Sequence, residues 1–132
     1  MNALLFTITE IQNENDIILV SGETLTGRIK GIWKADGLSP AVGASYQIEL
    51  DFGIIDRNTV TINPDAKDAS TEILNDSVSL TALCESIDEI YFLRFSFDGL
   101  EILEIENDDF TIQEGDFLTF EKPFAEIGIY PY

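Results

Sequence analysis

The side chains of this sequence that could do chemistry are almost all carboxylates. The chain has 25 aspartates and glutamates, seven lysines and arginines, one cysteine and no histidine, and its formal net charge is −18. Without histidine, the usual serine or cysteine nucleophile lacks its activating base. Cys84 lies in an apolar run with no basic neighbour that would lower the pKa of its thiol, so we interpret it as an inert core residue.

Two carboxylates can catalyse hydrolysis when their environments hold their pKa values apart. The sequence gives no such contrast, so an acid-only hydrolase is the weakest alternative. Residues 13–16 and 107–109 carry oxygen ligands for a hard cation, but neither cluster has the spacing of a calcium loop, and both are interpreted as turns. No catalytic residue, metal ligand or cofactor is predicted.

Acidic residues are densest between Glu85 and Asp116, where eleven carboxylates accompany a single base, Arg94. One interpretation is a solvated face that keeps the chain soluble and protects an edge strand against aggregation. The other is a docking surface for a basic protein, because a chain of this charge repels nucleic acid and anionic lipid and attracts cationic partners. Salt would slow such an association by screening the charges.

Five of these carboxylates form the predicted partner-binding surface. The apolar positions around them change phase, since Leu100 and Ile102 share one face of a strand while Leu103 and Ile105 share the next. Such a slip predicts a β-bulge near residues 102–103, which leaves the intervening glutamates outside. We therefore expect five acids to project together from one sheet surface and its following loop: Glu101, Glu104, Glu106, Asp108 and Asp109.

Alternating apolar and polar residues predict that β-strands carry these side chains. Leu4 and Ile8 mark the apolar positions of the first run, and similar runs separated by turn residues recur along the chain. The predicted fold is all-β: a single-domain β-barrel or sandwich of about 9–10 short antiparallel strands. Its core is expected to include three large aromatic residues, Trp33, Phe95 and Phe97.

Two hairpin turns bear on where the strands end. Asp98-Gly99 is the two-residue signal of a type I′ turn. The first hairpin turns either at residues 21–22 or at residues 26–27; local chemistry leaves both open, and the repeat described next favours the second. Gly31, within the strand that follows, is interpreted as a bend that lets a barrel close.

An internal repeat organises the predicted strands. Gly43 and Gly115, separated by 72 residues, each open a run that mixes apolar and polar side chains, and the same order of runs and turns precedes both. We predict one domain over residues 1–132, built by duplication of a four-strand unit. Its parts are unit one (~4–52), an irregular connector (~53–76) with an edge strand at 58–62, unit two (~77–122) and a closing strand (~124–130). The repeat pairs Phe6, Ile8, Ile17, Tyr46 and Ile48 with Val78, Leu80, Ile90, Leu118 and Phe120.

The expected cellular compartment and the class of protein follow from features that the sequence does not have. The single cysteine excludes an intramolecular disulfide, and the chain has neither a signal peptide nor the run of ~20 apolar residues that a membrane helix needs, so we expect a soluble, cytoplasmic protein. A short, acidic, β-rich chain without histidine, disulfide or catalytic motif resembles the immunity proteins of bacterial toxin–immunity pairs, whose partners are often basic nucleases. The resemblance implies a protein-binding function and assigns no role to any residue.

Three function classes remain. The first is a non-enzymatic, acidic binding protein that docks on a basic protein partner and neutralises or regulates it. The alternative is a small-molecule-binding β-barrel, whose aromatic-rich interior would need a cavity. The acid-only hydrolase is the third.

Overall fold

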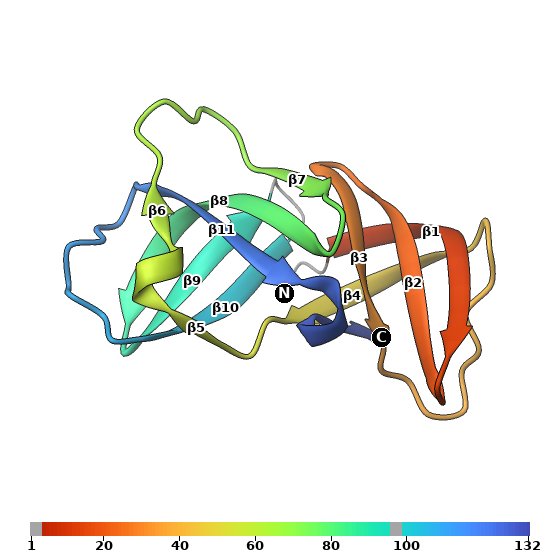
Figure 1. Ribbon diagram of the computed structural model, residues 1–132. Helices are drawn as coiled ribbons and strands as arrows, with labels where there is room; N and C mark the ends of the chain where they lie inside the picture. The colour runs from red at the N-terminus through yellow and green to blue at the C-terminus, as the bar shows by residue number, and fades with distance from the viewer. Residues whose placement is uncertain (1–3, 96–98) are drawn as a thin grey trace.

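The fold is all-β, as predicted, and is built around a closed barrel (Figure 1). The computed structural model describes residues 4–95 and 99–132. Phe97 and the turn at Asp98 lie outside the described residues, and of Phe95 only the backbone is described. Twelve strands and two 3-10 turns are present in these ranges, which exceeds the predicted strand number. The elements are β1 (Leu4–Glu14), β2 (Ile17–Thr24), β3 (Gly27–Trp33), β4 (Ser45–Asp51), β5 (Ile54–Asp56), η1 (Arg57–Thr59), β6 (Thr61–Ile62), β7 (Ser70–Ile73), β8 (Ser77–Asp88), β9 (Ile90–Phe95), β10 (Gly99–Glu106), β11 (Phe117–Pro123), η2 (Phe124–Glu126) and β12 (Gly128–Pro131).

Five strands close the barrel of the first half. β1 pairs with β2 and β4, and β2 pairs with β3, all antiparallel. β12, from the C-terminal end of the chain, completes the circle by pairing antiparallel with β4 and parallel with β3. The predicted closing strand therefore exists, but it begins at Gly128, because residues 124–126 form η2. Not every pairing is antiparallel, contrary to the prediction.

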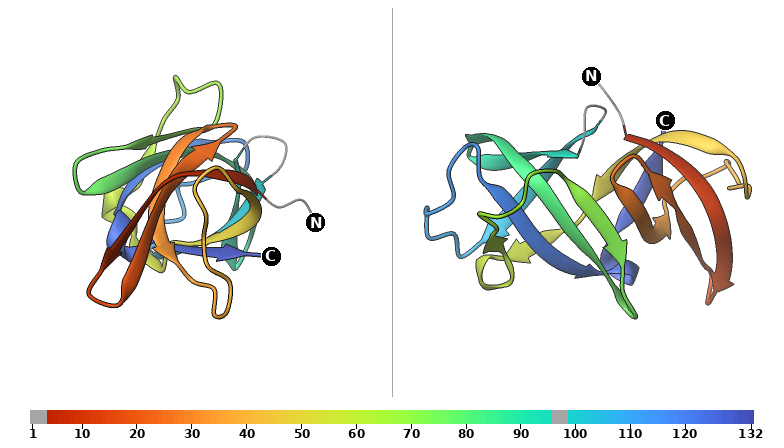
Figure 2. Two further views of the ribbon diagram at one scale, coloured as in Figure 1. Left: turned by 90° about the vertical axis from the view of Figure 1, so that its right-hand side faces the viewer. Right: turned by 90° about the horizontal axis from the view of Figure 1, so that it is seen from above.

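The second half repeats this order of pairings. β8 pairs with β9 and β11, and β9 pairs with β10, as β1 pairs with β2 and β4 and β2 with β3. β5 lies parallel to β10, and β6 pairs with β11. The segment after β4 thus completes the second half, while the segment after β11 returns to complete the first (Figures 1 and 2). The two halves exchange their closing strands.

Local details of the two halves also agree. The N–H of Gly43 donates to Ile8 O at 2.8 Å, and the N–H of Gly115 donates to Cys84 O at 2.8 Å. Both glycines have a positive φ, and the strand register shifts just after both acceptors. A backbone in this region favours glycine because an added Cβ would be strained. The duplication that would explain the agreement stays a prediction.

The residue correspondence is in part different from the predicted one. Leu4 lies opposite Ile48 in β4, and Leu80 lies opposite Phe120 in β11, so Leu80 corresponds to Leu4 and not to Ile8. A single spacing fails because the β8–β9 hairpin is shorter than the β1–β2 hairpin. The pairs Tyr46/Leu118 and Ile48/Phe120 are correct; Phe6/Val78, Ile8/Leu80 and Ile17/Ile90 are wrong.

One hydrophobic core joins both halves, and Trp33 lies within it. The Trp33 indole N–H donates to Leu38 O at 2.7 Å, which satisfies the polar atom of an otherwise apolar ring. Gly31 allows a close approach and not the predicted bend: the β2–β3 register passes through it without a shift, and a Cβ at this position would lie 2.7 Å from Ile127 O. A side chain there would hold the β12 segment away from β3.

The first hairpin turn and the connector differ in how far they follow the prediction. The first hairpin turns at residues 25–26, immediately before Gly27, so the second of the two alternatives is correct. The predicted edge strand at 58–62 is largely wrong, because η1 takes residues 57–59 and β6 is confined to residues 61–62. Asp56 ends β5 and caps this 3-10 turn by accepting the Asn58 N–H.

Candidate functional site

β10 keeps one uninterrupted register against β9, so the predicted bulge near residues 102–103 is wrong. The pairing runs from Gly99 opposite Phe95 to Leu103 opposite Tyr91 without a shift. Glu101, Leu103 and Ile105 therefore point inward by simple alternation, and the residues between them point outward. The five predicted acids do not share one surface.

Glu101 is in the core and not on the acidic face. Its side chain is 3% exposed, and its Oε2 accepts the backbone N–H of Leu50 at 3.0 Å. Burial raises the pKa of Glu101 to about 8; Glu49 adds to this effect and the Leu50 N–H opposes it. The carboxyl is therefore mostly protonated at neutral pH. The strand register gives Glu101 the place on β10 that the fully buried Ile29 holds on β3.

Glu104 and Glu106 are on the outer face of β10, as predicted. Both are exposed and, two residues apart, they point to the same side of the strand. They lie in the parallel ladder with β5, where Glu104 is opposite Ile54 and Glu106 is opposite Asp56. Asp56 also caps η1, and its pair with Glu106 is the last of the ladder. The acids therefore continue from this ladder toward the loop that follows β10.

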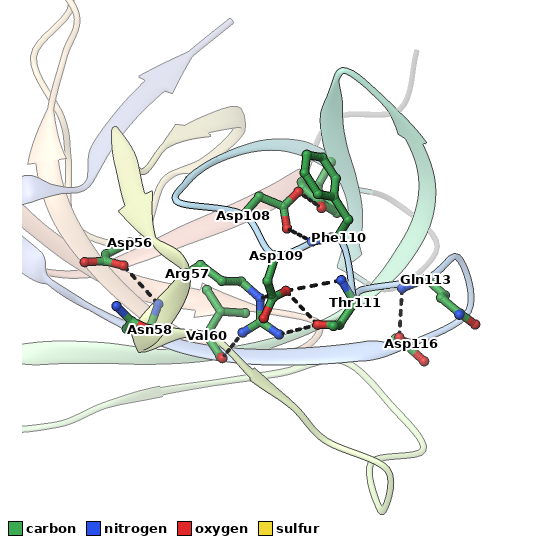
Figure 3. A network of polar contacts seen from close by, with 11 residues as sticks. Asp56, Arg57, Asn58, Val60, Asp108, Asp109, Phe110, Thr111, Gln113 and Asp116 are labelled. Atoms are coloured by element: carbon green, nitrogen blue, oxygen red, sulfur yellow. Dashed lines mark hydrogen bonds and ion pairs between the residues drawn. The ribbon is translucent and has the colours of Figure 1, made fainter.

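Asp108 and Asp109 lie in that loop, residues 107–116, which we call the acidic loop (Figure 3). Asp108 accepts the Tyr91 hydroxyl through one oxygen and the Phe110 N–H, at 2.9 Å, through the other. Burial, and then the hydrogen bond to Asp108, raise the pKa of Tyr91. The Asp108 carboxylate therefore anchors the loop to β9.

Asp109 anchors the same loop to η1. Its Oδ1 accepts the Thr111 hydroxyl at 2.7 Å, the Thr111 N–H at 3.1 Å and the Arg57 Nε–H at 3.0 Å. These donors hold the pKa of Asp109 below its usual value, with the Thr111 hydroxyl contributing most. Arg57 also donates to Val60 O and to the Thr111 hydroxyl, so one guanidinium ties the loop to a segment distant in the sequence (Figure 3).

Phe110, between these anchors, was not among the predicted site residues. Its side chain is 85% exposed, and its φ of 60° lies in the left-handed region. A bulky residue is rare in that conformation, which persists only where neighbouring contacts enforce it. Asp108 and Asp109 supply those contacts on either side. An aromatic residue directly after two aspartates was the one available sequence signal.

A hollow of about 410 Å³ lies between β4 and β10, where the two halves of the molecule meet. β5 pairs with β10 only from Glu104 onward, so the strand edge before Glu104 has no partner in β5 and borders this hollow. We call it the β4–β10 hollow. Its walls are partly apolar and partly acidic: Leu50, Ile54, Phe92, Leu100 and Ile102, with Gly53, Glu49, Asp51, Glu101 and Glu104.

Other chemistry finds little support among the described residues. No group of three or more acids or cysteines there is arranged to hold a metal ion. Among the described residues, Glu101 is the only buried carboxylate, and Glu49 and Asp51 beside it are exposed. Cys84 is fully buried, and its pKa is raised to about 11 by burial and by Asp116 and Glu114, so the thiol is protonated at neutral pH.

Comparison of the chain with protein-family models, with curated proteins and with solved structures gave no match. Within residues 4–95 and 99–132 there is no helix with the length and apolar character to cross a membrane. The argument for function therefore rests on the acidic loop, on the acids of the β5–β10 ladder and on the β4–β10 hollow.

Proposed function

We propose that this protein is an acidic binding protein that docks on a basic protein partner and neutralises or regulates it. The observation that carries the proposal is Phe110, an aromatic side chain 85% exposed to solvent and flanked by aspartates that fix its backbone. Exposed aromatic residues of this kind are typical anchors of protein interfaces. The partner is expected to offer an apolar pocket for Phe110 with lysines or arginines around it.

The anchors of the acidic loop favour tight binding because they order it in advance. Tyr91 holds Asp108, and Arg57 holds Asp109, so the loop around Phe110 is already folded before a partner arrives. Conformational entropy lost on binding lowers affinity, and a pre-ordered loop loses less of it. The strained φ of Phe110 has a reason in this interpretation, since it directs the aromatic ring into solvent.

The charge of the molecule supports a basic partner. Three ion pairs occur among the described residues, Arg57–Asp109, Arg94–Glu85 and Lys122–Glu126, against a net charge of −18. Most carboxylates thus remain available to cations. Glu104 and Glu106 extend this negative surface from the ladder with β5 toward the acidic loop. Complementary charge of this kind acts mainly on association rate and specificity.

The resemblance to immunity proteins extends the proposal to a toxin as the partner, which would be neutralised by occlusion of its basic surface. A protonated, buried thiol and the lack of any other cysteine fit a reducing, cytoplasmic location.

Capture of the partner by the full-length chain at low salt, followed by stopped-flow association at two salt concentrations, tests the proposal. We expect a basic protein whose association slows as salt rises. The double variant Glu104→Gln with Glu106→Gln should associate more slowly than the wild type at the same salt concentration. Its stability should not change, because both side chains are exposed. The matched control is Glu72→Gln combined with Glu121→Gln, on β7 and β11. A neutral or acidic partner, or a rate indifferent to salt, would contradict the proposal.

A further inference from the structure

The β4–β10 hollow and the acidic loop are connected by the β5–β10 ladder. Glu104 opposite Ile54 lies at the hollow, and Glu106 opposite Asp56 lies at the end nearer the acidic loop. At about 3.3 Å per residue the ladder spans only a few residues' length. A single protein partner can therefore contact Phe110 and reach the hollow at the same time.

We propose that the β4–β10 hollow accepts a lysine side chain of the basic partner, with its ammonium group at Glu101 and its aliphatic stem along the apolar walls. This inference rests on the proposed function and assigns a second anchor to the same interface. Leu50, Leu100 and Ile102 line the same hollow as Glu101, and apolar side chains suit the four-carbon stem of lysine. Exposed Glu49 and Glu104 add negative charge at the same hollow.

Glu101 favours lysine over arginine because one of its oxygens is already engaged. Oε2 accepts the Leu50 N–H, so the carboxylate cannot offer both oxygens to a guanidinium in the two-bond geometry that arginine prefers. An ammonium group is a compact charge and needs no such fork. The place of Glu101 in the fold also supports a binding role. An apolar residue at the position that it shares with Ile29 would avoid the free-energy cost of burying a carboxyl group.

Binding of an ammonium group changes the protonation of Glu101. The protonated carboxyl must release its proton to solvent before it can pair with the cation, so one proton leaves for each lysine bound. With a pKa of about 8, affinity is expected to rise about tenfold from pH 6 to pH 7 and to level off above pH 8.

Other charged groups face this position from the neighbouring strands. Glu49 and Asp51 lie on β4 and Glu104 lies on β10. Tyr132, which follows β12, has a pKa raised by burial and by Glu49, and it stays neutral. Lys122 on β11 is engaged elsewhere, since it donates to Ile54 O and pairs with Glu126 at 3.4 Å.

The site can be tested without the partner by using n-butylamine, which reproduces the lysine side chain. The Leu50 amide resonance of the full-length protein, followed by NMR during the titration, should shift saturably with butylammonium and not with n-butanol. Glu101→Gln retains an oxygen that can accept the Leu50 N–H but cannot pair with a cation, and it should weaken the response at least tenfold. Absence of a saturable shift, or an equal response in the glutamine variant, would overturn the inference.

Partner binding separates this inference from the proposed function. Both anchors are supported if Phe110→Ala and Glu101→Gln each weaken the complex at least tenfold, the second with loss of its dependence on pH between 6 and 8. If Phe110→Ala weakens the complex and Glu101→Gln binds as the wild type does, the lysine site is overturned and the proposed function stands. Leu25→Ala serves as the control for both, because Leu25 is also an exposed apolar residue and lies on the β2–β3 turn.

Discussion

The carboxylate of Glu101 accepts the backbone N–H of Leu50 at 3.0 Å, and this contact links β10 of the second half to β4 of the first. An acid from one half thus satisfies a strand donor of the other in the core of the molecule. The contact compensates only part of the cost of burying a carboxyl group, which is why its pKa is raised. Glu101 therefore couples the stability of the fold to pH.

Glu101→Gln should flatten the stability profile between about pH 4.5 and pH 8. The folded-state pKa of about 8 exceeds the ordinary value of 4.5, so the stabilising proton is fully present below pH 4.5 and is lost as pH rises through 8. At roughly 1.4 kcal/mol per pKa unit, the wild type should lose up to a few kcal/mol of unfolding free energy over this range. Urea unfolding at pH 5 and pH 9 measures it. Parallel profiles for the wild type and the variant would contradict the assignment, and Glu121→Gln is the exposed control.

Gly31→Ala should weaken closure of the barrel. The added Cβ would lie 2.7 Å from Ile127 O and 3.1 Å from the Ile127 side chain, so β3 and the β12 segment would have to separate. Overpacking of this kind costs about 1–3 kcal/mol. A lower urea midpoint than that of the wild type is expected, with the exposed Glu23→Ala on β2 as control. An unchanged midpoint would mean that the strands separate without cost.

Arg57→Gln should loosen the acidic loop while leaving the barrel folded. The guanidinium donates to Asp109, Val60 O and Thr111, and the variant loses most of these bonds. Hydrogen exchange at the Thr111 amide should become faster, because its acceptor Asp109 is no longer held. The loss of unfolding free energy should be small, because the ion pair with Asp109 is exposed to solvent. Exchange at Thr111 as slow as in the wild type would show that the loop is ordered by other contacts.

The exchanged closing strands predict that neither half folds alone. Residues 1–66 contain β1–β4 but lack β12, and residues 67–132 contain β8–β11 but lack β5 and β6. Each fragment would leave strand edges unpaired and part of the shared core exposed. Circular dichroism should show a native sheet signal only after the two fragments are mixed. A stable sheet in one fragment by itself would contradict the exchange.

The all-β class could be predicted from the sequence because the alternation of apolar and polar residues along a single strand is a local signal. The paired glycines at 43 and 115 also indicated correctly where β4 and β11 begin. The exchange of closing strands has no local signal, since it depends on which half a segment reaches after leaving its strand. The unequal hairpins displaced the predicted residue pairs for the same reason.

The candidate site was predicted in part. Glu104 and Glu106 are exposed as expected. The change of phase in the apolar positions predicts a bulge that would place Glu101 outside, and this bulge is absent. Phe110 is not predicted because its loop is held by hydrogen bonds from Tyr91 to Asp108 and from Arg57 to Asp109, and both donors lie far from the loop in the sequence. Apolar residues are ordinarily assigned to the core unless such long-range contacts are known.

The dissociation rate of the complex formed by the Phe110→Ala variant tests the central claim most directly. Truncation of a dominant interface anchor typically costs about 2 kcal/mol or more, which corresponds to roughly 30-fold faster dissociation. The association rate should change little, because the acids that steer the partner remain. We predict this result for the basic partner at physiological salt, with Leu25→Ala dissociating as the wild type does. Equal dissociation rates for the Phe110→Ala variant and the wild type would contradict the account.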